Sequence, residues 1–171
     1  MSVKTNWQAD GFFAEEINTG KAMERLAYHI GQMPVIYATF SSEQLLKKPA
    51  PDKWSKQEIL GHLVDSAINN LKRFTEIQFL PQPYQVISYK QNELVVVNAY
   101  QQLPLQHLLD LWKGLNQQII YVVQNIPVEK LNYPVDPKYD NKELKTLGWI
   151  VCDYVSHLEH HLAQIEKQLL F

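Results

Sequence analysis

Two histidines near the end of the chain, His157 and His161, have the residue type and spacing of metal ligands. They are four residues apart in a segment with helical periodicity, so their imidazoles should stand one turn apart on nearly the same face. One helix can in this way offer two nitrogen ligands to a divalent transition metal. Many histidine pairs at this spacing bind nothing, so the pair alone leaves a metal site and two ordinary inward histidines as equal alternatives.

The periodicity of the last helix, which should run from about Thr146 to Leu170, indicates which histidines face inward. Steps of three and four residues give a mainly apolar set that should face the core: Ile150, Tyr154, His157, His161 and Ile165. A second, polar set should face water or the edge of the fold: Asp153, Ser156, His160, Gln164 and Lys167. We therefore expect His157 and His161 to point inward and His160 to point outward.

A catalytic zinc-type site needs a third protein ligand and an open position for water or substrate. The remaining histidine candidates are His29, His62 and His107. His62 lies in a long helical segment, but outside its main apolar stripe, which consists of Leu60, Leu63, Val64, Ala67, Leu71 and Phe74. It belongs to a polar face with Glu58, Asp65, Ser66, Asn69 and Arg73. Such a face is either solvated or lines an internal pocket, and the spacing alone does not decide between the two.

Four long helical segments must position these residues. Their apolar stripes predict helices over about Ile17–Phe40, Lys56–Phe79, Pro104 to near Pro127, and Thr146–Leu170. The second has the clearest start, because Ser55 and Glu58 form a capping-box pattern and Trp54 stands where a hydrophobic staple would.

Shorter segments connect the long helices. Ser41–Leu46 should form a short capped helix, and the polar, proline-containing stretch Asn132–Asp140 should be an irregular loop. Asn92–Gln102 is predicted as a short helix, although Val95–Val97 would also suit a strand. The fold class predicted is all-α, a four-helix bundle with short additional helices, in a single domain over residues 1–171.

The composition narrows the classes of function. The hydrophobic content of 46% in 171 residues is enough for one sizeable core, and the net charge of -2 disfavours nucleic acid or a membrane surface as partner. The N-terminus lacks the apolar core of a signal peptide and the apolar runs are short, so we expect a cytoplasmic protein. The single cysteine, Cys152, is expected to be a buried, inert thiol, because no activating base is evident.

Two separated stretches of the sequence carry a family resemblance. The first comprises Trp54–Ser55, Glu58–Leu60, His62–Leu63, Asp65–Ser66, Asn69 and Arg73–Phe74. The second comprises Tyr154–Val155, His157, His160–Ala163 and Ile165. In order and spacing they resemble the DinB-like helical-bundle proteins, and within them the YfiT-type metal-dependent hydrolases, which include bacillithiol S-transferases. The resemblance extends from about Trp54 to the C-terminus, and the segment Leu80–Gln102 shares little with YfiT beyond Pro83–Tyr84.

This resemblance implies that the metal ligands are His62, His157 and His161, and that the metal is nickel or zinc. It also implies that the polar face around His62 lines a pocket rather than facing solvent. Asp65, Asn69 and Arg73 match the family pattern and are candidates for contacts to the ligands or the substrate. A homodimer is plausible for bundles of this family, although the sequence itself gives no direct sign of one.

Three functions remain open at this point. In the first, the metal lowers the pKa of a water molecule that attacks an amide or ester, with Asp65 or Glu58 orienting it, although no residue marks itself as the general base. In the second, the metal presents a low-molecular-weight thiol to an electrophile, and Arg73 holds an acidic group of that thiol. In the third, the bundle is a non-enzymatic binding or dimerisation module. The first two predict a small-molecule substrate.

Overall fold

The computed structural model describes residues 17–138 and 143–167. Four long helices form the body of the fold: α1 (Thr19–Ala38), α3 (Lys56–Glu76), α5 (Leu105–Gln124) and α6 (Leu147–Lys167). The short helices are α2 (Ser42–Leu46), α4 (Gln91–Val97), η1 (Tyr100–Gln102) and η2 (Val128–Asn132). Three short strands complete it: β1 (Tyr84–Gln85), β2 (Pro134–Asp136) and β3 (Lys145–Thr146). The predicted four-helix bundle with additional short helices is thereby confirmed.

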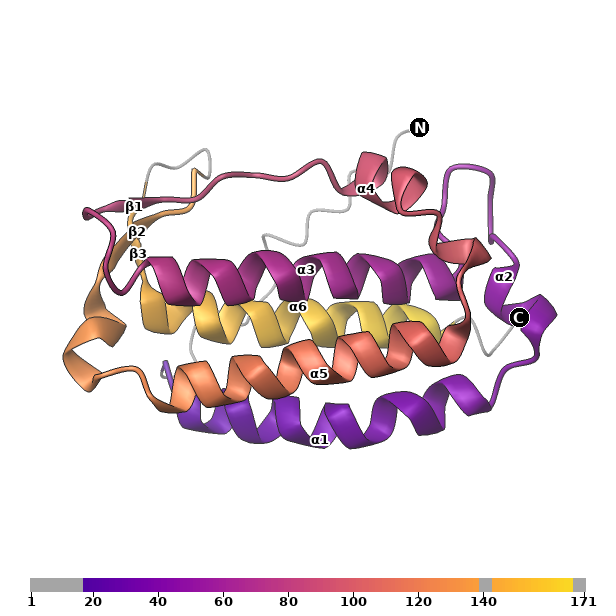
Figure 1. Cartoon of the computed structure of the whole chain (residues 1–171), viewed down its shortest axis with the longest axis horizontal. Helices are drawn as coiled ribbons and strands as arrows, with labels where there is room; N and C mark the ends of the chain where they lie inside the picture. Colours follow the sequence, from indigo (N-terminus) through magenta and orange to yellow (C-terminus); the bar gives the residue numbers. More distant parts are fainter. Residues whose placement is uncertain (1–16, 139–142, 168–171) are drawn as a thin grey trace.

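The long helices form a bundle in which α1 and α6 run in one direction and α3 and α5 in the other (Figure 1). α5 packs against α1 and α3, and α6 packs against the same two helices. The first two long helices of the chain, α1 and α3, therefore occupy opposite corners rather than neighbouring ones. As a result α3 and α6, which carry the histidines of interest, lie side by side although they are far apart in sequence.

Local sequence explains where these helices begin and which faces they bury. The Ser55 and Glu58 capping box is present, because the Ser55 side chain accepts from the Glu58 backbone and Glu58 accepts from the Ser55 backbone. Ser41 and Gln44 form a second capping box at the start of α2. Pro104 is the N-cap residue of α5 and lies just before its first turn, rather than inside that turn as the sequence predicted.

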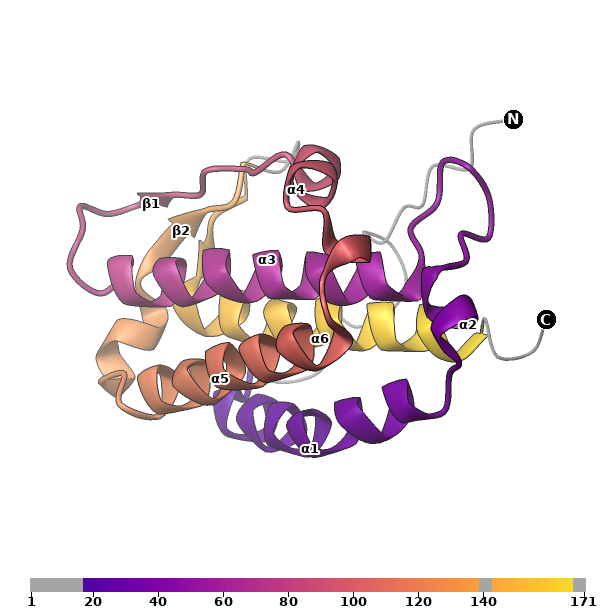
Figure 2. The same cartoon turned by 45° about the vertical axis from the view of Figure 1, so that its right-hand side comes forward.

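The connection between α3 and α5 covers the polar face of α3 (Figure 2). The Gln57 amide donates to the backbone oxygens of Tyr100 at 2.7 Å and Leu103 at 2.9 Å. The aromatic ring of Tyr100 lies directly on Gly61, where even a Cβ atom would come within 2.1 Å of it. This cover, together with the packing of α6 against α3, leaves the first half of α3 buried, and His62 is 0% exposed.

Two of the connecting segments had uncertain or irregular predictions. Val95–Val97 belongs to a helix, α4, which settles the alternative in favour of helix. The prediction of an irregular loop over Asn132–Asp140 is wrong for its central residues, because β2 pairs in parallel with β1 and antiparallel with β3. Val135, in the middle of β2, is fully buried, so a single apolar residue among prolines and aspartates is enough to hold the strand against the bundle.

Charged contacts join α1 to α6. Arg25 and His29 both hydrogen-bond the carboxylate of Glu159, with the Arg25 Nε at 2.9 Å and the His29 Nε2 at 3.0 Å. Burial raises the pKa of Glu159, but the hydrogen bonds from His29 and Arg25 and their charges outweigh it and lower that pKa to about 2. Glu159 thus stabilises the folded state in its ionised form. In the part of the chain that the structure describes, no helix is long and apolar enough to span a membrane.

We expect the Gly61→Ala substitution to destabilise the protein by about 1–3 kcal/mol, because the added methyl group displaces the Tyr100 ring. Gly114→Ala in α5 is the matched control, because its Cβ would meet nothing within 4 Å. That substitution should instead stabilise the helix by about 0.5–1 kcal/mol through the higher helix propensity of alanine. Urea unfolding of both variants tests this, and equal stabilisation by the two would contradict the close contact.

We expect Glu159→Gln to lower the free energy of unfolding by about 1 kcal/mol at neutral pH, a value that allows for the partial exposure of the contact. Because the folded pKa is depressed, the wild-type advantage should be present above about pH 4.5, the ordinary value, and shrink as the pH falls toward 2. Urea unfolding over a pH series measures it. Glu24→Gln, at an exposed position of α1, is the control and should show no such loss.

Candidate metal centre

His62, His157 and His161 come together between α3 and α6. Each offers one ring nitrogen, and these atoms all lie within 4.8 Å of one another. The Nε2 atom of His157 lies 3.4 Å from Nε2 of His62 and 3.1 Å from Nε2 of His161. The inward orientation expected for His157 and His161 is confirmed, and the solvated alternative for His62 is excluded. His160 is exposed, as expected.

The two separations that involve His157 suit a shared ion. Ligand nitrogens at about 2.0–2.1 Å from a metal lie about 2.8–3.0 Å apart in octahedral and about 3.3–3.4 Å apart in tetrahedral geometry. The two Nε2 separations, 3.4 and 3.1 Å, lie close to these values, and all three ligand atoms lie within 4.8 Å of one another. Three lone-pair nitrogens aimed at one point repel each other unless a proton or a cation lies between them, so the donor set suits a divalent metal of the imidazole-preferring type.

Burial keeps all three imidazoles in the form that binds metals. Desolvation, reinforced by the neighbouring His161, lowers the pKa of His62 to about 3. Desolvation also lowers the pKa of His161 to about 4, although its hydrogen bond to Gln164 opposes this. The pKa of His157 is lowered well below its ordinary value by burial and by the other histidines. The cluster is therefore neutral at physiological pH, and its nitrogens are available as ligands.

A side chain that the sequence placed on the outer face orients His161. The Gln164 Oε1 atom lies 2.9 Å from Nδ1 of His161, and the Gln164 amide contacts the exposed His160 at 2.9 Å. A glutamine oxygen can only accept, so the proton of His161 is on Nδ1 and its Nε2 lone pair faces the other histidines. Gln164 lies three residues after His161, and this spacing is the signal that could have identified it.

Trp54 forms part of the wall of the cluster. Its ring centroid lies 4.7 Å from that of His62, at an interplanar angle of 33°, and 6.4 Å from that of His161. The sequence suggested a staple for the start of α3, and the structure shows in addition that this aromatic ring packs over two of the three histidines. Of the other tryptophans, Trp112 is buried in the core, Trp149 packs against the core, and Trp7 lies outside the described residues.

The other histidine candidates lie elsewhere. His29 pairs with Glu159 between α1 and α6, and His107 is exposed on α5. Cys152 is only partly buried and does not belong to the cluster. Asp153 was expected on the outer face with His160 but is largely buried, and this burial raises its pKa to about 6 against the opposing charges of Arg73 and Lys145.

Two carboxylates flank His62 on α3, and both oxygens of one of them, Glu58, have partners. Glu58 caps the helix through the Ser55 backbone at 2.8 Å and forms an ion pair with Lys48 at 2.8 Å. Asp65 is buried under η1, where its Oδ1 atom accepts from the Tyr100 hydroxyl at 2.6 Å and from the Asn98 amide at 3.2 Å. Neither Tyr100 nor Asn98 stood out in the sequence, because the contact depends on how the connection crosses α3.

Asn69 and Arg73 make contacts away from the histidines. The Asn69 amide donates to the backbone oxygen of Asp65 at 2.8 Å. Arg73 lies about three turns beyond His62, about 16 Å along the helix axis, and donates to the backbone oxygen of Ile87 at 3.1 Å. Its guanidinium also lies 5.8 Å from the centre of the Tyr89 ring. Arg73 therefore ties the connection to α3.

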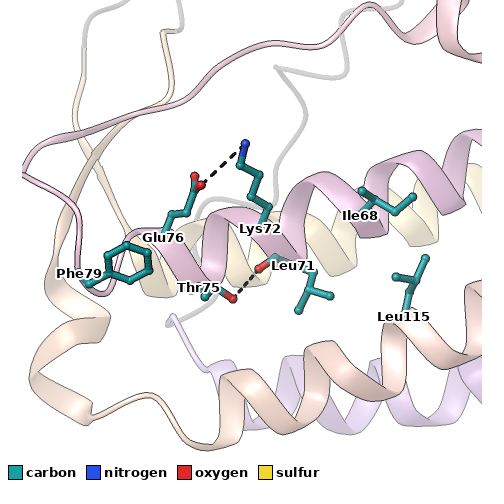
Figure 3. A pocket seen from close by; sticks show the side chains of 7 residues that line it. All are labelled: Ile68, Leu71, Lys72, Thr75, Glu76, Phe79 and Leu115. Atoms are coloured by element: carbon teal, nitrogen blue, oxygen red, sulfur yellow. Dashed lines mark hydrogen bonds and ion pairs between the residues drawn. The ribbon is translucent and has the colours of Figure 1, made fainter.

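A separate groove lies on the outer surface of α3 and α5 (Figure 3). It has a volume of about 440 Å³ and is mainly apolar, and it contains none of the three clustered histidines. Its lining consists of Ile68, Leu71, Lys72, Thr75, Glu76, Phe79 and Leu115. The chemistry-bearing residues thus lie on a different face of α3 from this groove.

Comparison with known proteins agrees with the family that the sequence resembles. The chain matches the DinB superfamily over residues 20–165, and no curated protein matches it. Among solved structures, YfiT from Bacillus subtilis is similar, with a TM-score of 0.80 at 18% identity, covering 94% of this chain and 90% of that one. That protein is described as a probable metal-dependent hydrolase with an unusual four-helix bundle topology. At this identity the likeness is one of fold, and the family match over most of the chain shows that the protein belongs to the DinB superfamily.

Proposed function

We propose that His62, His157 and His161 bind one divalent metal ion and that the protein is a metal-dependent hydrolase of small molecules. The observation that carries the proposal is the convergence of three neutral imidazoles, two of them buried and that of His157 half-buried, with Nε2 separations of 3.1 and 3.4 Å. The description of the structurally similar YfiT as a probable metal-dependent hydrolase supports it. Nickel or zinc is the metal we propose, because imidazole nitrogens suit both.

A divalent ion in this position would act as a Lewis acid that lowers the pKa of water and polarises a carbonyl or similar group. The residues of the chain have separate tasks around it. The three histidines contribute no charge, so the full charge of the ion acts on the substrate side. Gln164 fixes the tautomer of His161, and the Trp54 ring limits the access of water to His62. Glu58 is unsuited to be the base, because both of its oxygens have partners.

The metal site is tested by measuring metal content. The purified protein should contain about one zinc or nickel ion per chain, and a hundredfold excess of metal over its dissociation constant should stabilise it by about 2.7 kcal/mol. The His157→Ala/His161→Ala variant should lose both the metal and this stabilisation. His107→Ala, at an exposed position of α5, is the control and should retain both. Unchanged metal content in the double variant would refute the site.

The reaction class is tested by a substrate screen with the metal-loaded protein. We expect hydrolysis of amide or ester substrates without added thiol, and a loss of at least about a hundredfold in kcat/KM for the double histidine variant. A low-molecular-weight thiol is the decisive addition. Turnover that requires the thiol would replace hydrolysis by thiol S-transfer as the function. Absence of turnover under both conditions, with metal bound, would instead favour a non-enzymatic binding module.

A further inference from the structure

Three buried side-chain atoms have no hydrogen-bond partner among the described residues: His62 Nδ1, Asp65 Oδ2 and Trp112 Nε1. Leaving a buried polar atom unpaired costs about 1–3 kcal/mol, so each such atom needs an explanation. Trp112 lies in the core of the bundle. The other two belong to residues three apart on α3, and one of them, the carboxylate oxygen, can only accept when ionised.

A metal ion at the histidine cluster determines what the first of these atoms must do. His62 faces His157 with Nε2, so this nitrogen would bind the ion through its lone pair. The proton of the neutral imidazole is then on Nδ1, which becomes a buried donor. Histidine ligands usually donate this proton to a carboxylate, a carbonyl or water, and the contact fixes the ring and strengthens the ligand.

Asp65 is the acceptor that the surroundings of His62 leave available. Glu58, the other carboxylate one turn away, already accepts from the Ser55 backbone with one oxygen and pairs with Lys48 through the other. Asp65 is held through Oδ1, by Tyr100 and Asn98. Its Oδ2 atom is buried and has no hydrogen-bond partner within residues 17–138 and 143–167.

The helix geometry places the Asp65 carboxylate beside the turn of His62. Residues three apart on a helix have Cβ atoms about 5–6 Å apart, and side chains lean toward the N-terminus, so Asp65 leans over the turn that contains His62. Rotation of an aspartate carboxylate about its last bond meets only a shallow barrier. The Tyr100 ring lies on Gly61 and its hydroxyl donates to Oδ1, so Tyr100 holds the carboxylate at this turn, and the hydroxyl can follow Oδ1 through a small rotation that brings Oδ2 toward the imidazole.

We propose that Asp65 is the positioning residue of the metal centre and that its Oδ2 atom accepts the Nδ1 proton of His62 when the ion is bound. This inference rests on the proposed metal site. Asp65 then contacts a metal ligand rather than the substrate. Tyr100 and Asn98 hold one oxygen of its carboxylate by hydrogen bonds and leave the other oxygen available to His62.

The affinity for Zn²⁺ alone, measured by competition with a chromophoric chelator, tests the proposal without any substrate. Asp65→Asn should weaken Zn²⁺ binding about 10–100-fold, the usual effect of losing such a partner. Tyr100→Phe removes the hydroxyl contact to Oδ1 but keeps the carboxylate, so it should weaken binding clearly less. Asp110→Asn removes a carboxylate at an exposed position of α5 and should leave binding unchanged. An Asp65→Asn loss no larger than that of Tyr100→Phe would overturn the proposal.

A second measurement needs no change at Asp65 and therefore does not depend on the folding of that variant. In long-range ¹H–¹⁵N spectra of the Zn²⁺-loaded wild-type protein, the His62 ring should show a protonated Nδ1 whose proton is shifted downfield and exchanges slowly. The signal is assigned by its loss in His62→Gln. A rapidly exchanging Nδ1 proton in protein that binds Zn²⁺ overturns the role of Asp65 alone, whereas wild-type protein that binds no Zn²⁺ overturns the metal site as well.

Discussion

The seating of the Tyr100 ring on Gly61 is the contact on which the interior of this bundle depends. It closes the long connection between α3 and α5 onto the polar face of α3, and it works only because that position has no side chain. Without this cover the polar face would be more solvated, which is one of the two alternatives that its sequence pattern leaves open. With it, His62 and Asp65 lie in a low-dielectric space, where unpaired polar atoms and neutral imidazoles have large energetic consequences.

Burying these polar groups costs free energy, and the apolar packing of the rest of the fold offsets that cost. Three imidazoles, two buried and one half-buried, are held without charge, and a carboxylate is buried on the same helix as His62 with hydrogen bonds from a tyrosine and an asparagine. Around them the apolar sides of the four long helices form one continuous core. The ion pair of Glu159 with Arg25 and His29 joins α1 to α6 within the stretch of α6 that also contains His157 and His161.

Much of this arrangement could be predicted from the sequence, because the strongest signals are local. The capping box at Ser55, the apolar stripe of α6 and the spacing of His157 and His161 depend on helix periodicity alone. The burial of His62 could not be read from periodicity, because tertiary packing brings its neighbours Trp54, His157 and His161 to it. For the same reason Tyr100 and Asn98 went unnoticed, and the strand around Val135 looked like a loop. Family resemblance supplied His62, since related sequences carry the information about long-range packing that a single helix pattern lacks.

The order of the helices gives the histidine cluster a further property. His62 and His157 are 95 residues apart in the chain, and they meet because α6 packs against α3. In the unfolded chain such distant groups have little chance of meeting, because closing so long a loop is entropically costly. An ion held by both would therefore be a reversible cross-link between the two halves of a protein with a single cysteine, which cannot form an internal disulfide. Metal binding would then indicate that the helices are correctly arranged, since neither half of the chain contains all three histidines.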